Sequence, residues 1–332
     1  MPSREAALKA LPQSQTWRDV SRLARDNAAY IALVLLILVF SIVAGGPFLS
    51  LRNWTYIAQQ APVLVIVAIA ETFLITAGFI DLSVGSLLGL AGFVAAWGVE
   101  TYGLWGLSFA LAAGFICGLI NGAIFAYVRI PSFIVTLGMM VVLRAVLQIA
   151  SGGEAIYLSD LAANVRGYAA FDALGRFPWI LIVAIAVCGA CWTVYNRTIF
   201  GDDLKAMGGN ERAVGLFGVN LNNRRVQVFV IAGVVTGVAS LINLARIGAA
   251  TPVTGTGMEL EAISAVVLGG TPLTGGYGSV LKTVVGAVAL VVLSSGLTIA
   301  GVPPSWNDVV RGLLLIVAIG IALDRRKIGT VK

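Results

Sequence analysis

Residues 61–80 read APVLVIVAIAETFLITAGFI, twenty positions of which only Glu71 is charged. A helix needs about 20 mostly apolar residues to cross the hydrocarbon core of a bilayer. This stretch therefore predicts a membrane-spanning helix, and it decides the fold class because nine further stretches share its apolar character. The candidate spans are 28–48, 61–80, 82–99, 104–128, 132–150, 177–195, 226–245, 258–270, 282–300 and 305–323.

The composition agrees with a membrane protein. Hydrophobic residues make up 58% of the 332 positions and charged residues 11%, whereas about 25% of a soluble domain is charged. The predicted fold class is all-α, a polytopic transmembrane helical bundle of about ten spans with interrupted helices. The span at 258–270 is too short to cross alone, so we expect it to be broken or shielded by neighbouring helices.

The basic residues predict the orientation of the chain. When the N-terminus is placed inside, sixteen of the 22 Lys and Arg residues fall on the cytoplasmic side, as the positive-inside rule requires. Both termini are therefore expected in the cytoplasm. The predicted organisation is a cytoplasmic segment 1–27, a transmembrane domain 28–323 with an outer loop 151–176 and an inner loop 196–225, and a cytoplasmic tail 324–332.

Several function classes find no support in the sequence. The net charge of +6 is explained by basic residues beside anionic lipid, so no nucleic-acid partner is predicted. The chain has no histidine, the commonest general base and metal ligand. The phosphate-binding pattern G-x-x-x-x-G-K-[ST] is also absent. We therefore predict no catalytic residue, metal, cofactor or ATP site of its own.

A polar motif separates the second and third predicted spans. Residues 78–86 read GFIDLSVGS and place Asp81, Ser83 and Ser86 between two apolar stretches. Asp81 or Ser83 could cap the third span by accepting a backbone N–H. These residues could also line a polar path, because broken helices are tolerated where they border a cavity. Both interpretations remain open.

A second motif begins the fifth predicted span. Pro131 is a typical residue for the first turn of a helix, and Thr136 is a candidate to line a path. Arg144 lies two turns deeper, and an ionisable residue inside a span is a functional candidate. An ion pair of Arg144 with Glu71 or Glu154 would explain it equally well.

The inner loop contains a third motif, GGNERAVGLFG at 208–218. Asn210 is a good N-cap, Glu211 suits the positive end of a helix, and Gly218 is a typical stop. These signals predict a helix of about seven residues, roughly 10 Å long. Its apolar side chains, which we expect to be exposed and to need a partner surface, are Val214, Leu216 and Phe217. The alternative is a capped helix folded against its own membrane domain.

Small residues recur at helical spacing in two spans. Gly114, Gly118 and Gly122 are four residues apart, and so are Gly233 and Gly237. In lipid such ridges let helix backbones approach closely, so packing is their predicted role.

Taken in order, the motifs resemble the membrane-spanning permeases of bacterial ribose-type ABC importers, in the branch that also includes branched-chain amino acid permeases. The likeness runs from about residue 30 to 326 and is carried by 80–85, 130–138, 206–218 and 259–279. The last of these begins with acidic residues and ends in a turn rich in Gly and Thr. Phe79 departs from the family pattern, in which sugar permeases usually carry glycine.

The resemblance implies a permease subunit in the bacterial inner membrane that forms the translocation path for a monosaccharide or related polyol. It implies a permease homodimer or heterodimer, two cytoplasmic ATP-binding subunits, and a periplasmic or lipid-anchored solute-binding protein. The residues expected at the path are Asp81, Ser83, Ser86 and Thr136. The residues expected to contact the ATPase are Gly208, Asn210, Glu211, Val214, Leu216 and Phe217.

Two alternatives stay open at this stage. An ion-coupled secondary transporter usually needs several membrane carboxylates or a histidine, and this chain offers Glu71, Asp81 and Glu259. An ABC permease for another small polar solute, such as a branched-chain amino acid or a nucleoside, would share the same motifs.

Overall fold

The computed structural model describes residues 27–158 and 175–303, together with 171, 173, 306, 309, 310, 312, 313 and 316. The predicted tail and most of the last predicted span lie outside these residues, as do residues 1–26.

In chain order the elements are α3 (Ala28–Val43), α4 (Gly45–Leu49), α5 (Leu51–Thr76), α6 (Val84–Tyr102), the 3₁₀ helix η1 (Gly103–Leu107), α7 (Ser108–Ala123), the π-helix η2 (Ile124–Val128), α8 (Ser132–Ser151), β1 (Ile156–Tyr157), α11 (Trp179–Arg197), α12 (Ile199–Leu216), α13 (Leu221–Ile247), β2 (Ala249–Ala250), α14 (Met258–Leu268) and α15 (Val280–Ile299).

Six helical stretches in the described part of the chain are long and apolar enough to cross a membrane. They are Leu51–Thr76, Val84–Val128, Ser132–Ser151, Trp179–Arg197, Leu221–Ile247 and Val280–Ile299. The 45-residue stretch Val84–Val128 contains two predicted spans, which turn η1 joins. The all-α, polytopic fold class is thereby confirmed. The count of ten spans and the cytoplasmic termini stay predictions.

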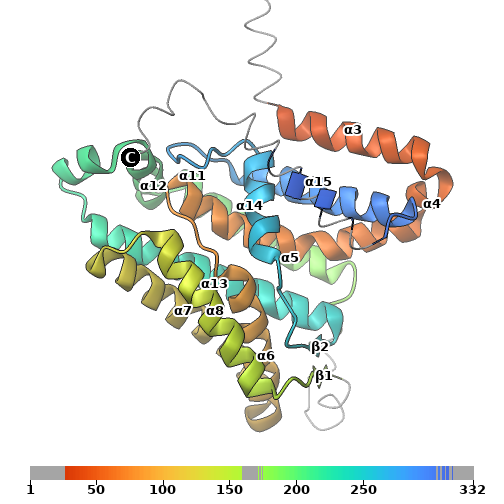
Figure 1. Cartoon of the computed structure of the whole chain (residues 1–332), viewed down its shortest axis with the longest axis horizontal. Coiled ribbons are helices and arrows are strands. Elements are labelled where there is room, and N and C mark those ends of the chain that lie inside the picture. The colour runs from red at the N-terminus through yellow and green to blue at the C-terminus, as the bar shows by residue number, and fades with distance from the viewer. Residues whose placement is uncertain are drawn as a thin grey trace, which may run out of the picture.

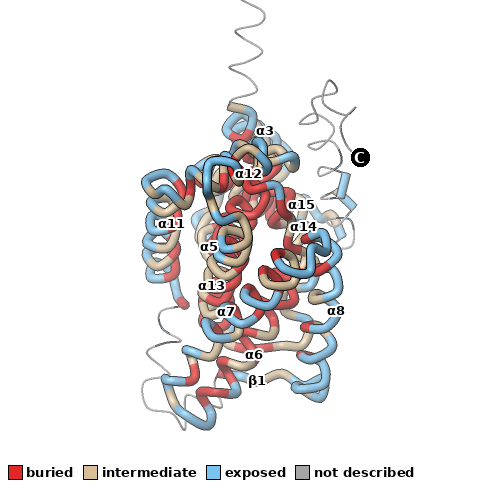
Figure 2. The backbone as a smooth tube through the Cα atoms, turned by 90° about the vertical axis from the view of Figure 1, so that its left-hand side faces the viewer, coloured by how far each residue is buried: buried red, intermediate tan, exposed pale blue. Residues whose placement is uncertain are grey.

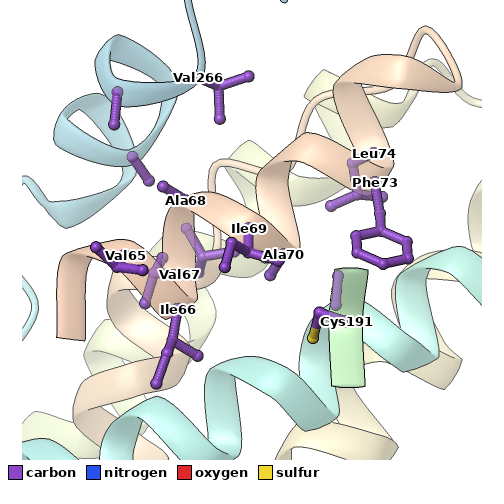
Figure 3. Packing of buried hydrophobic residues seen from close by; sticks show 14 of the residues in the cluster. Val65, Ile66, Val67, Ala68, Ile69, Ala70, Phe73, Leu74, Cys191 and Val266 are labelled. Carbon is purple, nitrogen blue, oxygen red and sulfur yellow. The ribbon is translucent and has the colours of Figure 1, made fainter. Parts of the chain in front are cut away.

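Helix α5 forms the centre of the bundle. It starts ten residues before the predicted span, because Ser50 accepts the N–H of Asn53 and the helix then runs on through polar residues. All its residues from Ala61 to Thr76 are buried. In Figure 3, α5 side chains such as Val67 and Phe73 lie among the neighbouring helices, with Val266 of α14 close by. Helix α5 ends where Gly78 adopts a left-handed φ of +86°, a conformation that favours glycine.

Helices α7 and α13 share the most extensive contact among the described elements. A Cβ atom on Gly114 would overlap the carbonyl group of Gly233, and one on Gly118 would overlap that of Phe229. The two backbones therefore touch directly, which only small residues permit. This contact confirms the predicted packing role of the glycine ridges.

The molecule has two distinct ends, which Figure 1 shows on opposite sides. One carries α12 and is called here the α12 end. The other carries a short antiparallel ribbon in which Ile156 of β1 pairs with Ala250 of β2, and is called the β1–β2 end. Between the ends, the buried residues concentrate on α5 and α13, while α8 and α11 are largely exposed at the sides (Figure 2).

Candidate functional site

The chain is broken between α5 and α6, at residues 77–83, and α8 supplies the hydrogen bonds that the broken helix lacks. The N–H of Ile80 donates to Ser132 Oγ over 3.2 Å, and the N–H of Leu82 donates to Thr136 Oγ1 over 3.1 Å. The hydroxyl group of Thr136 lies 3.3 Å from the carbonyl oxygen of Ile80. Backbone groups inside a membrane protein must find such partners, so the first turn of α8 holds the break in place.

Asp81 organises the polar side of this break. Its Oδ1 accepts the backbone N–H of Ser83 over 2.7 Å and the Ser83 hydroxyl over 2.5 Å. The Asn121 side chain on α7 donates to Ser83 Oγ over 3.0 Å. Ser83 is the N-cap residue of α6 but makes no side-chain capping bond. The carboxylate of Asp81 therefore fixes the N-cap residue just before α6, but its bonds do not reach the N–H groups of the first helical turn, so the capping interpretation is not confirmed.

The four predicted path residues are all buried inside the single chain. Their exposed fractions are 3% for Asp81, 0% for Ser83, 1% for Ser86 and 0% for Thr136. Asp81 and Ser83 lie in the break itself, and Thr136 bonds to the backbone of Ile80 and Leu82. The structure therefore brings these three predicted residues together. Their place in a path stays a prediction, because Oδ1 of Asp81 and the hydroxyl groups of Ser83 and Thr136 bond to protein groups in this chain.

We expect Asp81→Ala to destabilise the protein and Asp81→Asn to leave it folded. Alanine would leave the buried N–H and hydroxyl of Ser83 without their acceptor, which costs roughly 1–3 kcal/mol per unsatisfied group. Asparagine keeps an acceptor oxygen and caps about as well as aspartate. Thermal unfolding of the purified variants in detergent measures both effects. An Asp81→Asn protein that melts like the parent but transports poorly would show that the charge has a role beyond capping.

Arg144 and Glu71 do not form the ion pair that was one interpretation of the sequence. Arg144 does not pair with Glu71 or Glu154; its Nη1 donates instead to the carbonyl oxygens of Pro252, over 3.2 Å, and Thr254, over 2.8 Å. The ion-pair expectation was wrong because backbone carbonyls more than a hundred residues away take its place. Glu71 is fully buried on α5, and both its carboxylate oxygens lack a hydrogen-bond partner in the described part of the molecule.

Helix α12 confirms the predicted caps of the inner-loop helix. Asn210 leaves the helical conformation, with φ −158° and ψ 90°, and its Oδ1 accepts the N–H of Ala213 over 3.1 Å. The helix ends at Leu216, and Gly218 follows with φ +87°. The sequence had not indicated the preceding helical turns from Ile199 onward, because they carry no long apolar run.

The exposure of the three apolar residues on α12 corrects one expectation. Leu216 and Phe217 are 89% and 90% exposed, but Val214 is only 8% exposed and packs into the main hydrophobic core. Residues two apart on a helix point about 200° from each other, so Val214 and Leu216 cannot share a face. Glu211 is tied down by an ion pair to Arg225 over 2.9 Å. The exposed apolar tip of α12 is therefore Leu216 and Phe217.

Gly208 lies where four segments meet. A Cβ atom here would overlap the carbonyl group of Thr76 and the backbone nitrogen of Gly276. Gly276 donates its N–H to Thr76 O over 2.8 Å, and Thr76 Oγ1 lies 3.0 Å from the hydroxyl of Tyr195. We call Thr76, Tyr195, Gly208 and Gly276 the Thr76 junction. It connects α12 to the end of α5, two residues before Gly78 opens the break.

Comparisons with known proteins cover nearly the whole chain. The family model described as "Branched-chain amino acid transport system / permease component" matches residues 53–319. The ribose import permease protein RbsC of Escherichia coli (strain K12) is 36% identical over 307 residues, which cover 91% of this chain and 94% of that protein. The fructose import permease protein FrcC of Rhizobium meliloti is 34% identical, covering 90% and 85%. The galactose/methyl galactoside import permease protein MglC of Escherichia coli (strain K12) is 33% identical, covering 90% and 94%. No solved structure matches.

Proposed function

Because the chain belongs to the family of branched-chain amino acid transport system permease components, we propose that it is the membrane-spanning permease of an ATP-binding cassette importer. Its place is the bacterial inner membrane, and its solute is a monosaccharide or a related polyol. The observation that carries this proposal is the likeness to the ribose import permease over 91% of the chain. The fructose and galactose permeases support the same solute class.

We infer the partners from two features, the missing P-loop and the exposed apolar tip of α12. It has no P-loop of its own, so separate cytoplasmic subunits supply ATP hydrolysis, two for each pair of permeases. The exposed apolar tip of α12 is the surface that such a subunit would bury. A second permease, identical or similar, completes the path, and a solute-binding protein on the outer side selects the solute.

The mechanism we propose is alternating access. Closure of the ATPase pair pushes on residues 210–217, at the end of α12, and the Thr76 junction passes the movement to the break at 77–83. The direct backbone contact of Gly208 with Thr76 supports this route, because packed backbones move together. An uncharged solute needs only brief polar contacts in such a path.

Reconstitution tests the proposal. Vesicles containing the permease, its ATPase and its binding protein should take up sugar only when ATP is supplied. Among the described residues, the carboxylates of Glu71, Asp81 and Glu259 favour the rival, an ion-coupled transporter, and Glu71 is the most deeply buried of them. Uptake driven by an ion gradient through the permease alone would overturn the importer proposal.

The orientation of the chain gives a separate prediction. Asn223, at the α12 end, and Glu154, at the β1–β2 end, are both exposed. Single cysteines at these positions, in a background without Cys117, Cys188 and Cys191, should react with a membrane-impermeant thiol reagent from opposite sides. Asn223→Cys should react only from the cytoplasmic side. Reaction of both from one side would contradict the predicted topology.

A further inference from the structure

Arg144 and Glu259 place two charges among helices that are long and apolar enough to cross a membrane. Arg144 lies inside the membrane-length helix Ser132–Ser151. The carboxylate of Glu259, near the start of α14, lies against Gly85, inside the membrane-length stretch Val84–Val128.

Both residues lie next to a non-helical segment of backbone. Arg144 Nη1 bonds to the carbonyls of Pro252 and Thr254, which belong to the 251–257 segment between β2 and α14. That segment lies directly on α6, because Gly255, with φ +76°, leaves no room for a Cβ beside Gly85. The Glu259 carboxylate packs over the same Gly85. Binding sites at the membrane midplane are typically formed at such discontinuous helices.

Neither charge is enclosed by the chain. Arg144 and Glu259 are both partly exposed, as is Thr254, and Thr256 of the same 251–257 segment is exposed. Most of the α8 surface is apolar, apart from the exposed Gln148. Its exposed apolar side chains include Phe133, Ile134, Leu137, Val141, Val142, Val146 and Ile149. Charges inside membrane-spanning helices face a bundle interior or a water-filled cavity rather than lipid, because their burial in hydrocarbon costs several kcal/mol. The face that carries this pair must therefore be turned toward water or a polar partner.

We propose that Arg144 and Glu259 line the translocation path and form hydrogen bonds with an uncharged, polyhydroxylated solute as it crosses the membrane. This inference rests on the proposed function and adds a contact site to it. It differs from the path residues expected from sequence, which are all buried in the single chain.

The chemistry of the pair suits hydroxyl groups. Of the five N–H donors of a guanidinium, the described contacts engage only those on Nη1 of Arg144. Glu259 acts on Arg144 electrostatically, but the two form no ion pair at 4.0 Å or less, although both lie in the described part of the chain. A hydroxyl donates and accepts at once, so a sugar could bond to the guanidinium and the carboxylate together.

The first test asks whether water reaches this face. In the background without native cysteines, Thr256→Cys in the assembled complex should react with a charged, water-soluble thiol reagent at least tenfold faster than Ile116→Cys. Ile116 is the matched control, since it is 54% exposed on α7 and has no charged neighbour among its helical contacts. Equal rates, or no reaction of Thr256→Cys with and without ATP, would overturn the inference.

The second test asks whether the solute uses the charges. Glu259→Gln keeps the size and an acceptor oxygen, and Arg144→Gln removes the guanidinium. Each should slow ATP-driven uptake of ribose, fructose or galactose by about tenfold or more, the effect of losing a hydrogen bond to a charged group, while subunit assembly and melting temperature of Glu259→Gln stay unchanged. Glu154→Gln, at the β1–β2 end, is the control.

The outcomes separate the two proposals. Normal uptake by both variants, in a complex whose parent imports sugar with ATP, would refute the path-lining role and leave the importer intact. A parent complex that shows no ATP-driven uptake would refute the importer, whatever the labelling shows.

Discussion

Replacing Leu216 with Asp should release the ATP-binding subunits from the purified complex and abolish solute-stimulated ATP hydrolysis. Leu216 and Phe217 are almost fully exposed in the single chain. Burial of a large apolar side chain stabilises a contact by roughly 1.5–3 kcal/mol, and an uncompensated carboxylate in the same groove adds a desolvation cost. The change lies outside the membrane-length helices, so insertion of the permease should be unaffected.

The matched control is Leu49→Asp. Leu49 is 54% exposed on the short helix α4, which also lies outside the membrane-length helices, and the same change there should leave the ATPase bound. Affinity purification through the permease, followed by measurement of the subunit ratio, distinguishes the two variants. ATPase subunits retained at the parental ratio by Leu216→Asp would show that the exposed tip of α12 is not their docking surface.

The fold class follows from sequence because lipid permits few backbone solutions. Apolar stretches of about twenty residues must be helical to satisfy their own N–H and C=O groups. Residues 61–80 therefore predicted a span, and Gly114 and Gly118 predicted a close helix contact. The start of α5 at Leu51 could not be predicted from hydropathy, because its first turns contain Arg52, Gln59 and Gln60 and are helical through capping and packing.

The candidate site was less accessible to sequence reasoning, since a motif gives residue types and not their exposure. Asp81 and Thr136 were recognised as unusual polar residues between spans, yet nothing in the pattern shows that they are buried and hydrogen-bonded at the break. Arg144 was recognised as well. Its acceptors are two backbone carbonyls, and a search for opposite charges could not have found them.

Phe79 is a further residue whose surroundings could not be predicted from the sequence. It stands where the resemblance leads one to expect glycine. Its ring packs edge-on against Phe125 at 4.6 Å between centroids and stacks on Phe229 at 6.4 Å. An aromatic side chain here fills the space between the break, η2 and α13. The side chain of Phe79, which is larger than the expected glycine, is therefore accommodated by packing against Phe125 and Phe229.

The second large effect is expected at the Thr76 junction. Gly208→Ala should abolish sugar uptake or prevent accumulation of the folded protein, because its Cβ would overlap backbone atoms of both Thr76 and Gly276. Backbone cannot move aside as a flexible side chain can, so α12 must separate from the end of α5. Overpacking of this kind typically costs 1–3 kcal/mol or more.

Gly209 provides a control in the same helix. A Cβ on Gly209 would meet no atom within 4 Å, and alanine is a better helix former than glycine by about 1 kcal/mol. Gly209→Ala should therefore match or exceed the parent in melting temperature and import sugar normally. The decisive measurement is uptake per ATP hydrolysed. If Gly208→Ala folds and keeps its ATPase bound through the intact tip at Leu216 and Phe217, it should hydrolyse ATP with little or no uptake. Equal coupling in the two alanine variants would mean that movement of α12 does not reach the break through this junction.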